Sequence, residues 1–286
     1  MTTPYVTHTD LVDGFHRLGL VPGMRVMVHS ALSTLGYVEG GPTAIISALM
    51  ETLTPEGTLL MPSFNHGAPF APGAPGYYHP RETATTNGAI PDHFWRMDGV
   101  QRSLNPTHPF AAWGRDAERY TRLHHRTLTM GPDSPLGLLH QDEGACLLLG
   151  VDYRSNTFHH HVEMSTGAPC LGQRTEAYPV VLPDGRRVMG RTWGWRQQAC
   201  PFTDSNRYAD EMVPLQRTSK IGGSEVTFYR LKDCYSVVAD ILEHGKDGFP
   251  PCRGCPIRPR HVAETVPSDW DAEQAALRPD SDALTY

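Results

Sequence analysis

The segment Cys146-Leu147-Leu148-Leu149-Gly150-Val151 is the strongest strand signal of the chain and decides the predicted fold. A continuous apolar run of this length is typical of a strand in the centre of a sheet, buried on both faces. It leads into Asn156-Thr157-Phe158-His159-His160-His161-Val162-Glu163, where Asn156 can cap a helix. The sequence therefore predicts a central strand followed by a helix, and in α/β folds ligands bind at the carboxyl ends of such strands.

The segments before this strand alternate between helix and strand. Asp10 can cap a helix that ends at Gly19, and Pro42 suits the first turn of a second helix with an apolar face over residues 45–53. Short apolar strands are predicted at residues 26–28 and 58–61. Strand, helix and strand in this order are what a parallel sheet requires.

The C-terminal third has a different pattern. It predicts an antiparallel hairpin at residues 178–189, a strand at 226–231 and a helix at 237–242. We therefore expect a three-layer α/β fold with a central, mostly parallel sheet, to which this hairpin and a helical subregion are added. A single domain is predicted over residues 1–265, followed by a polar tail over residues 266–286.

Composition excludes several classes of protein. The net charge is −6 over 286 residues, the mean hydropathy is −0.39, and no run approaches the about 20 apolar residues of a membrane span. The first residues lack a basic-then-apolar signal region, so a cytoplasmic protein is expected. A mildly acidic chain without a basic tract argues against nucleic acid as a partner and favours a cationic ligand.

The predicted helix after the central strand places chemically active side chains together. His160 and Glu163 are three residues apart and share a helix face, as do Thr157 and His160. A carboxylate beside an imidazole fixes its tautomer, which suits a general base. Solvated or core histidines are the alternative interpretation. A metal site built from His159, His160 and His161 is disfavoured, because adjacent helical side chains diverge by about 100°.

Five blocks of sequence carry a resemblance to a known family. In chain order they are Val28-His29-Ser30-Ala31-Leu32-Ser33, then Gly57-Thr58-Leu59-Leu60-Met61-Pro62-Ser63, then Arg102-Ser103 with Pro106-Thr107-His108-Pro109, then Gly131-Pro132-Asp133-Ser134-Pro135, and last Leu148-Leu149-Gly150-Val151 followed by Asn156-Thr157 and His160-x-x-Glu163. Together they resemble the aminoglycoside 3-N-acetyltransferase family, also called the antibiotic acetyltransferases. The match runs from roughly residue 10 to 170 and more loosely to about residue 260.

This resemblance implies a fold distinct from the GNAT-type acetyltransferases, and acetyl-coenzyme A as the cosubstrate. It implies that His160 is the catalytic base, that Glu163 orients it, and that Thr157 lies near the thioester. The residues that it implies for the coenzyme are His29, Ser30 and Ser33 along the pantetheine arm, Arg102, Ser103, Ser134 and Pro135 at its border, and Ser63 at a strand end beneath it.

The chain also departs from the family pattern. Family members often have histidine where this chain has Asn105. The loop over residues 65–80 lacks the acidic residues that some members offer to a polycationic antibiotic, and it contains Tyr77 instead. Acidic groups for the substrate are then expected from Asp204, Asp210 and Glu211, although a solvated helix face explains those charges equally well.

The six cysteines do not form a disulfide scaffold in a chain of this length. Cys252 and Cys255 form a C-x-x-C pair, which is half of a zinc site, a redox pair or a coincidence. Some family members with such a pair also carry a cysteine near the position of Cys200, so a structural zinc with Cys200 as third ligand is a candidate.

The sequence therefore favours a cytoplasmic N-acetyltransferase that modifies an aminoglycoside at the 3-amino group and confers antibiotic resistance. The alternatives are an N-acetyltransferase for another amine-bearing natural product, a metal-dependent hydrolase built on residues 159–161, and a binding protein without catalysis. A homodimer is possible for each of these.

Overall fold

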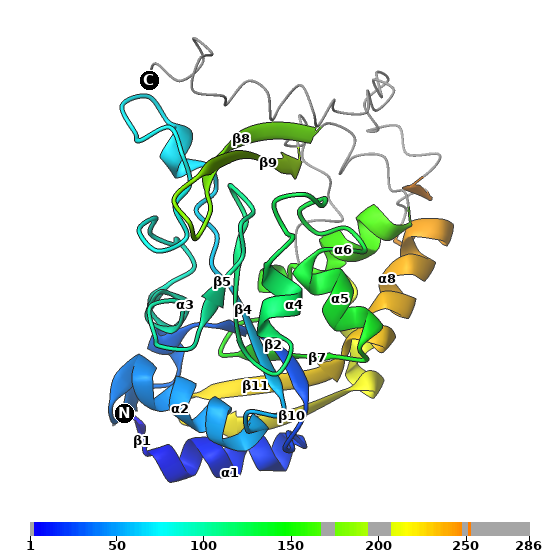
Figure 1. Cartoon of the computed structure of the whole chain (residues 1–286). Coiled ribbons are helices and arrows are strands. Elements are labelled where there is room, and N and C mark those ends of the chain that lie inside the picture. The colour runs from blue at the N-terminus through cyan, green and yellow to red at the C-terminus, as the bar shows by residue number, and fades with distance from the viewer. Residues whose placement is uncertain (1–2, 167–174, 194–206, 248–250, 253–286) are drawn as a thin grey trace, which may run out of the picture.

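The computed structural model describes residues 3–166, 175–193, 207–247 and 251–252, and its centre is a seven-stranded sheet (Figure 1). The strand order is β10-β11-β7-β2-β4-β6-β5. The strands are β2 (Arg25–Ser30), β4 (Thr58–Pro62), β5 (Gln101–Arg102), β6 (Phe110–Gly114), β7 (Ala145–Leu149), β10 (Gln216–Ile221) and β11 (Ser224–Arg230). The predicted apolar run forms β7, next to β2 in the middle of the sheet.

The sheet is mixed. Strand β2 pairs in parallel with β4 and with β7. The other four pairings of this sheet are antiparallel. The predicted α/β class is confirmed, but the expected mostly parallel sheet is wrong. An apolar run indicates that a strand is buried and does not indicate its direction.

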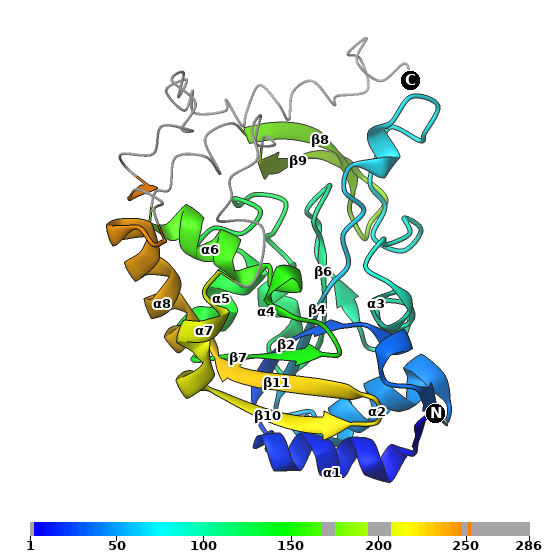
Figure 2. The same cartoon turned by 180° about the vertical axis from the view of Figure 1, so that it is seen from behind.

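Helices cover both faces of the sheet and give the predicted three layers (Figure 2). One face packs against α1 (His8–Leu18), α2 (Gly41–Leu53) and α3 (Ala89–Phe94). The other face packs against α4 (Ala117–Thr121), α5 (Pro135–Gln141), α6 (Phe158–Ser165) and α8 (Leu231–His244). Side chains alternate between the two cores along each strand, so that Val26 and Val28 face the first group while Met27 faces the second.

Two predicted helix caps differ in detail from the structure. Thr7 caps α1 through a capping box in which Asp10 is the third helical residue, so Asp10 supports the cap and is not the cap itself. Gly19 ends α1 with a φ of 90°, as expected. Thr157 occupies the position before α6, and Asn156 instead accepts a hydrogen bond from the Phe158 N–H through its side-chain oxygen.

The predicted hairpin is confirmed and forms its own two-stranded sheet of β8 (Thr175–Val181) and β9 (Arg187–Trp193). It lies beyond the carboxyl ends of the central strands, beside the long loop that follows β4 (Figure 1). Tyr78 of that loop bridges to Val180. The remaining short elements are β1 (Tyr5–Val6), β3 (Tyr37–Val38), α7 (Ala209–Met212) and the 3₁₀ turns η1 (Leu32–Thr34), η2 (Ala68–Phe70), η3 (Tyr153–Ser155) and η4 (Val213–Leu215).

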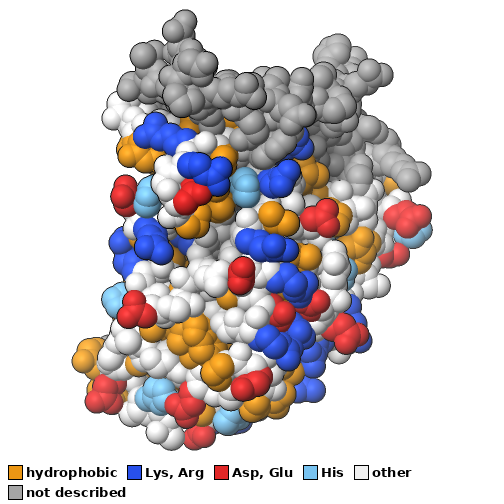
Figure 3. Space-filling view, in the orientation of Figure 1, with side chains coloured by type: hydrophobic (Ala, Val, Ile, Leu, Met, Phe, Trp, Pro, Cys, Tyr) orange, Lys and Arg blue, Asp and Glu red, His pale blue; other side chains and the backbone are white. Residues whose placement is uncertain are grey.

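Charged side chains of both signs are interspersed over the described surface (Figure 3). Within the described ranges, the longest helices fall short of the length and apolar character that a membrane span requires. The predicted tail over residues 266–286, and most of the segment just before it, lie outside the described residues.

Candidate active site

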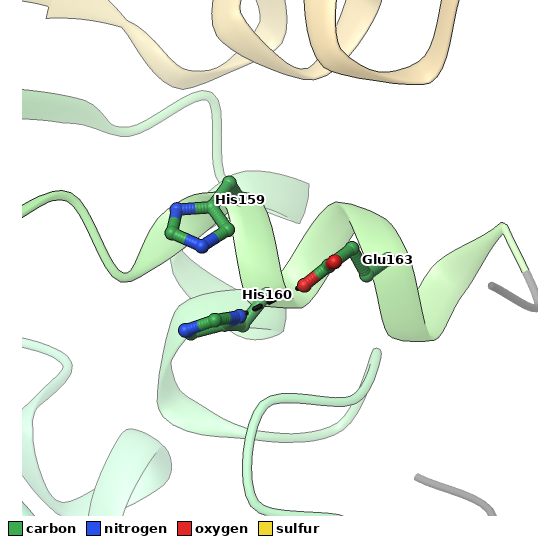
Figure 4. A group of neighbouring side chains, drawn as sticks. All are labelled: His159, His160 and Glu163. Atoms are coloured by element: carbon green, nitrogen blue, oxygen red, sulfur yellow. Dashed lines mark hydrogen bonds and ion pairs between the residues drawn. The ribbon is translucent and has the colours of Figure 1, made fainter. Parts of the chain in front are cut away.

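His160 and Glu163 form a contact on α6, the helix that follows the central strand β7. The His160 Nδ1–H donates to a Glu163 carboxylate oxygen over 2.8 Å. The Glu163 side chain is 1% exposed and that of His160 is 22% exposed. Figure 4 shows one ring nitrogen of His160 facing Glu163 and the other pointing away from it. The predicted pair therefore has the geometry of a base and its orienting carboxylate.

The neighbouring histidines do not converge on one point. The His159 Nδ1–H donates to the Asn156 carbonyl over 2.5 Å. His161 is buried, its Nδ1–H donates to the Met130 carbonyl, and burial lowers its pKa to about 4. Because His161 turns toward α5, a site made of all three histidines is not formed. Ligand atoms of His159, His160 and Glu163 do lie within 4.8 Å of one another.

Thr157 is held at the start of α6 by a residue from β2. Nε2 of His29 lies 3.4 Å from the backbone nitrogen of Thr157 and 3.4 Å from its hydroxyl oxygen. Burial lowers the pKa of His29 to about 3, so its imidazole is neutral and Nε2 accepts hydrogen bonds. The predicted coenzyme residue His29 thus contacts the predicted catalytic residue Thr157.

The serines predicted near the coenzyme occupy the ends of neighbouring strands. Ser30 shares a face of β2 with Val28, and Ser63 shares a face of its strand with Met61, opposite to the face of His29. Their hydroxyl oxygens are buried and have no hydrogen-bond partner within the described part of the chain. Ser33 lies in η1 and is exposed. The block over residues 29–33 is therefore divided between the two faces of the sheet.

Arg102 and Ser103 bond to the protein interior. The Arg102 guanidinium donates to the carbonyls of Ser63, Pro80 and Thr83, and its side chain lies under Trp95 with 4.5 Å between guanidinium carbon and ring centre. The Ser103 hydroxyl donates to Nδ1 of His124 and accepts from the Phe110 N–H, each over 2.8 Å. Arg102 thereby attaches the loop after β4 to the sheet, and the Ser103 side chain joins the start of β6 to the segment that contains His124.

Ser134 and Pro135 begin α5. The Ser134 hydroxyl oxygen accepts from the Gly137 N–H over 3.2 Å and its proton goes to the Gly131 carbonyl over 2.7 Å. Pro135 occupies the first turn, and both side chains are buried. In the structure this block is a helix cap.

The described substrate candidates fall in two places, Tyr77 on the loop after β4 and the adjacent pair Asp210 and Glu211 on α7. Tyr77 lies against the hairpin, with the Arg187 guanidinium 4.3 Å from its ring centre. Asp210 is exposed on α7, and Glu211 pairs with Lys246 over 2.5 Å. Asp204 lies outside the described residues, as do Cys200 and Cys255 of the predicted zinc site. Cys252 is half-buried and packs against the core beneath α8.

Three aromatic rings beside the site were not singled out by sequence reasoning. Phe64, His66 and His108 make mutual edge contacts with ring centres 4.9 to 5.8 Å apart. His108 is buried, and burial together with the nearby His66 and His160 lowers its pKa well below the usual range. The Pro106-Thr107-His108-Pro109 block was the signal that the sequence offered for His108. The sequence did not show which residues of the long loop lie against this block.

The chain thus combines a mixed α/β fold with a hydrogen-bonded histidine and carboxylate pair on the helix that follows its central strand. The chain belongs to the aminoglycoside 3-N-acetyltransferase family, whose model matches residues 27–243. It is therefore an aminoglycoside N-acetyltransferase family enzyme, and the resemblance stated from the sequence is confirmed.

Curated relatives support this membership. Aminoglycoside N(3)-acetyltransferase IV of a Salmonella species is 33% identical over 270 residues, which cover 91% of this chain and 96% of that protein. The SPbeta prophage-derived aminoglycoside N(3')-acetyltransferase-like protein YokD of Bacillus subtilis is 36% identical over 192 residues, 58% of this chain and 70% of the relative.

Solved structures share the fold. The crystal structure of YokD aligns with a TM-score of 0.72 at 28% identity, covering 85% of this chain and 95% of that chain. Aminoglycoside acetyltransferase AAC(3)-Xa gives a TM-score of 0.72 at 28% identity over 84% of this chain and 94% of that chain. The mixed central sheet is thus a property of the family's fold.

Proposed function

We propose that this protein transfers the acetyl group of acetyl-coenzyme A to an amine of an aminoglycoside, at the 3-amino group, with His160 as general base. The observation that carries the proposal is the 2.8 Å hydrogen bond between Nδ1 of His160 and the buried Glu163 carboxylate. This bond leaves Nε2 of a neutral imidazole as the acceptor, directed away from the carboxylate.

The chemistry proceeds by direct attack. The amine nitrogen forms a bond to the thioester carbonyl carbon, and His160 accepts the proton that the nitrogen loses. The carbon–sulfur bond then breaks, and the proton passes to the departing thiolate to give free coenzyme A. Glu163 stabilises the imidazolium that exists between these proton transfers. The role proposed for the Thr157 hydroxyl, next to His29, is a hydrogen bond to the reacting group.

Ser30, Ser33, Ser63 and His29 are the residues we propose for the acetyl donor. Ser30 ends β2 and Ser63 directly follows β4, at the strand ends where ligands bind in α/β folds, and Ser33 lies in the η1 turn after β2. Arg102, Ser103, Ser134 and Pro135 contribute by shaping this edge, since their polar groups bond internally.

The substrate class follows from the relatives. The AAC(3)-IVa structures include a histidine-to-alanine mutant in complex with a gentamicin, at 28% identity to this chain and a TM-score of 0.69, and another in complex with apramycin. Acetylation removes a positive charge from such a drug, and antibiotic resistance is the proposed outcome. The alternative substrate is another amine-bearing natural product, favoured by the tyrosines and histidines of the loop over residues 65–80.

A metal-dependent hydrolase is the second candidate, because ligand atoms of His159, His160 and Glu163 lie within 4.8 Å of one another. Two ligands of one tetrahedral ion are about 3.4 Å apart when each bond is about 2.1 Å. The 2.8 Å contact between His160 and Glu163 is shorter and is a direct hydrogen bond. This favours the base and carboxylate interpretation.

The decisive experiment measures thiol release from acetyl-coenzyme A with a panel of aminoglycosides and simple amines. His160→Ala is expected to lose nearly all turnover and to bind acetyl-coenzyme A as before. His16→Ala, on the exposed face of α1, is the matched control. Dialysis against a chelator tests the second candidate. Activity that is lost when an ion is removed and restored when the ion is added back would support the hydrolase.

A structural zinc at Cys200, Cys252 and Cys255, a homodimer and a cytoplasmic location remain proposals. Metal analysis of the purified protein tests the zinc site, and light scattering tests the oligomeric state.

A further inference from the structure

Asn105 lies in the turn between β5 and β6 and is completely buried. Its side-chain oxygen accepts from the His108 N–H over 2.9 Å and from the Thr107 N–H over 3.2 Å. These bonds close the turn and orient the backbone of His108. No apolar residue could replace them, because two buried N–H groups would lose their acceptor.

The other end of the same amide reaches the hairpin. Nδ2 of Asn105 donates to the Arg191 carbonyl over 2.9 Å and to the Thr129 hydroxyl over 3.1 Å. Next to Arg191, the Thr192 hydroxyl contacts the hydroxyls of Thr107 and Thr129. A single side chain therefore ties β9 to a turn that lies 86 residues earlier.

The long loop after β4 is attached to the same turn. The Thr107 carbonyl accepts from the N–H groups of Asn65 and His66 over 3.1 and 3.0 Å, and the Pro106 carbonyl accepts from the Asn65 side chain over 2.9 Å. The turn at Asn105 thus meets the loop on one side and the hairpin on the other. The rings of His66 and His108 meet there, and burial together with the nearby His66 and His160 lowers the pKa of His108.

We propose that Asn105 is a positioning residue, whose amide fixes the β8–β9 hairpin and the start of the loop over residues 65–87 relative to α6 and so sets the amine-binding side of the site. The effect on substrate rests on the proposed acetyl transfer. The effect on the hairpin does not rest on that function, so the effect on substrate binding and the effect on the hairpin are tested separately.

The chemistry of an amide is specific to this position. One donor is needed toward Arg191 of β9, a second toward Thr129 and an acceptor toward His108, and asparagine supplies all three in one planar group. Asn105→Asp keeps the shape but places a carboxylate against the Arg191 carbonyl, where no proton joins the two oxygens. Thr129→Val is a milder change that removes one partner of the same amide and keeps its volume.

The experiment combines hydrogen exchange with substrate binding. In Asn105→Asp, peptides within residues 175–193 are expected to exchange at least tenfold faster, whereas peptides of β10 and β11 keep the wild-type rate. The KM for the amine is expected to rise at least tenfold, while the Kd for acetyl-coenzyme A stays within twofold. Thr129→Val is expected to move both quantities in the same direction by a smaller factor.

The matched control is Gln101→Glu, an amide-to-carboxylate change on the exposed end of β5 that preserves the acceptor for the Thr121 hydroxyl. Wild-type exchange of the hairpin in both variants overturns the proposal, as does a parallel loss of amine and acetyl-coenzyme A binding. If no amine reacts with the wild-type enzyme, the acetyl-transfer function fails, and the exchange data still decide whether Asn105 holds the hairpin.

Discussion

Nε2 of His29, at the end of β2, lies 3.4 Å from both the backbone nitrogen and the hydroxyl oxygen of Thr157, which is 128 residues later in the chain. This contact connects the end of β2 to the start of α6, the helix that carries His160 and follows the neighbouring strand β7. The start of α6 is therefore held by a neutral imidazole from a different strand.

Two replacements of His29 test whether its hydrogen-bond acceptor or the packing of its ring stabilises the protein. His29→Gln retains an acceptor and should keep most of the stability. His29→Leu leaves the half-buried Thr157 N–H without this acceptor and should cost about 1 kcal/mol in the free energy of unfolding. Urea titration of both variants measures the difference, and equal destabilisation would contradict the role of Nε2.

The buried histidines predict how stability depends on pH. Burial lowers the pKa of His29 and of His124 to about 3, from an ordinary value of 6.5. Between these two pH values the unfolded chain binds more protons than the folded protein, so the stability present above pH 6.5 is lost as the pH falls toward 3. Each of the two groups contributes a slope of about 1.4 kcal/mol per pH unit. Denaturant midpoints at pH 7.5 and pH 5 test this, and an unchanged midpoint would refute it.

The Glu163→Gln variant should separate the orientation of the His160 ring by residue 163 from the effect of the Glu163 negative charge. The glutamine keeps the shape of the buried side chain and can still accept from Nδ1 of His160, but it no longer stabilises the imidazolium. We expect kcat to fall by about 100-fold or more, with little change in the Kd for acetyl-coenzyme A. Glu118→Gln, on the exposed side of α4, is the control for the charge change. A Glu163→Gln enzyme with wild-type kcat would remove Glu163 from the mechanism.

Arg102→Lys should loosen the loop that follows β4. A lysine cannot reach the carbonyls of Ser63, Pro80 and Thr83 together, because its ammonium is a point donor on a flexible stem. The lost charged hydrogen bonds are worth about 2–3 kcal/mol, a fall in Tm of roughly 5–10 °C.

Arg96→Lys provides the comparison for Arg102→Lys. Arg96 also stacks on Trp95, with 4.0 Å between guanidinium carbon and ring centre, but it is half exposed and forms its ion pair with Asp92 of α3. The Tm of this variant should change by about 1 °C or less, since exposed ion pairs contribute little. Similar shifts in the two variants would mean that stacking, and not the carbonyl contacts, carries the effect.

The sequence predicted correctly that His160 and Glu163 share a face of one helix. The apolar run at residues 146–151 and the three-residue spacing of His160 and Glu163 are local patterns, and the structure brings the pair into contact on α6. The hairpin and the helix before Gly245 follow from similar local signals. Their roles in catalysis stay predictions.

The parts that were missed depend on contacts between distant segments. Arg102 and Ser103 occupy family blocks, but only the tertiary structure gives their partners inside the protein. The amide of Asn105 finds a carbonyl 86 residues away, and no periodicity encodes such a partner. The antiparallel outer strands of the sheet were also missed, because the pattern of buried residues does not show the direction of a strand.

The hairpin of β8 and β9 forms no ladder with the seven-stranded sheet, and within the described ranges its backbone meets the rest of the chain at a few points such as Tyr78 and Asn105. A two-stranded unit attached in this way can change its length and outward side chains without disturbing the strand order that builds α6. Under the proposed function, changes of amine specificity are therefore expected to arise in this hairpin while His160 and Glu163 stay unchanged.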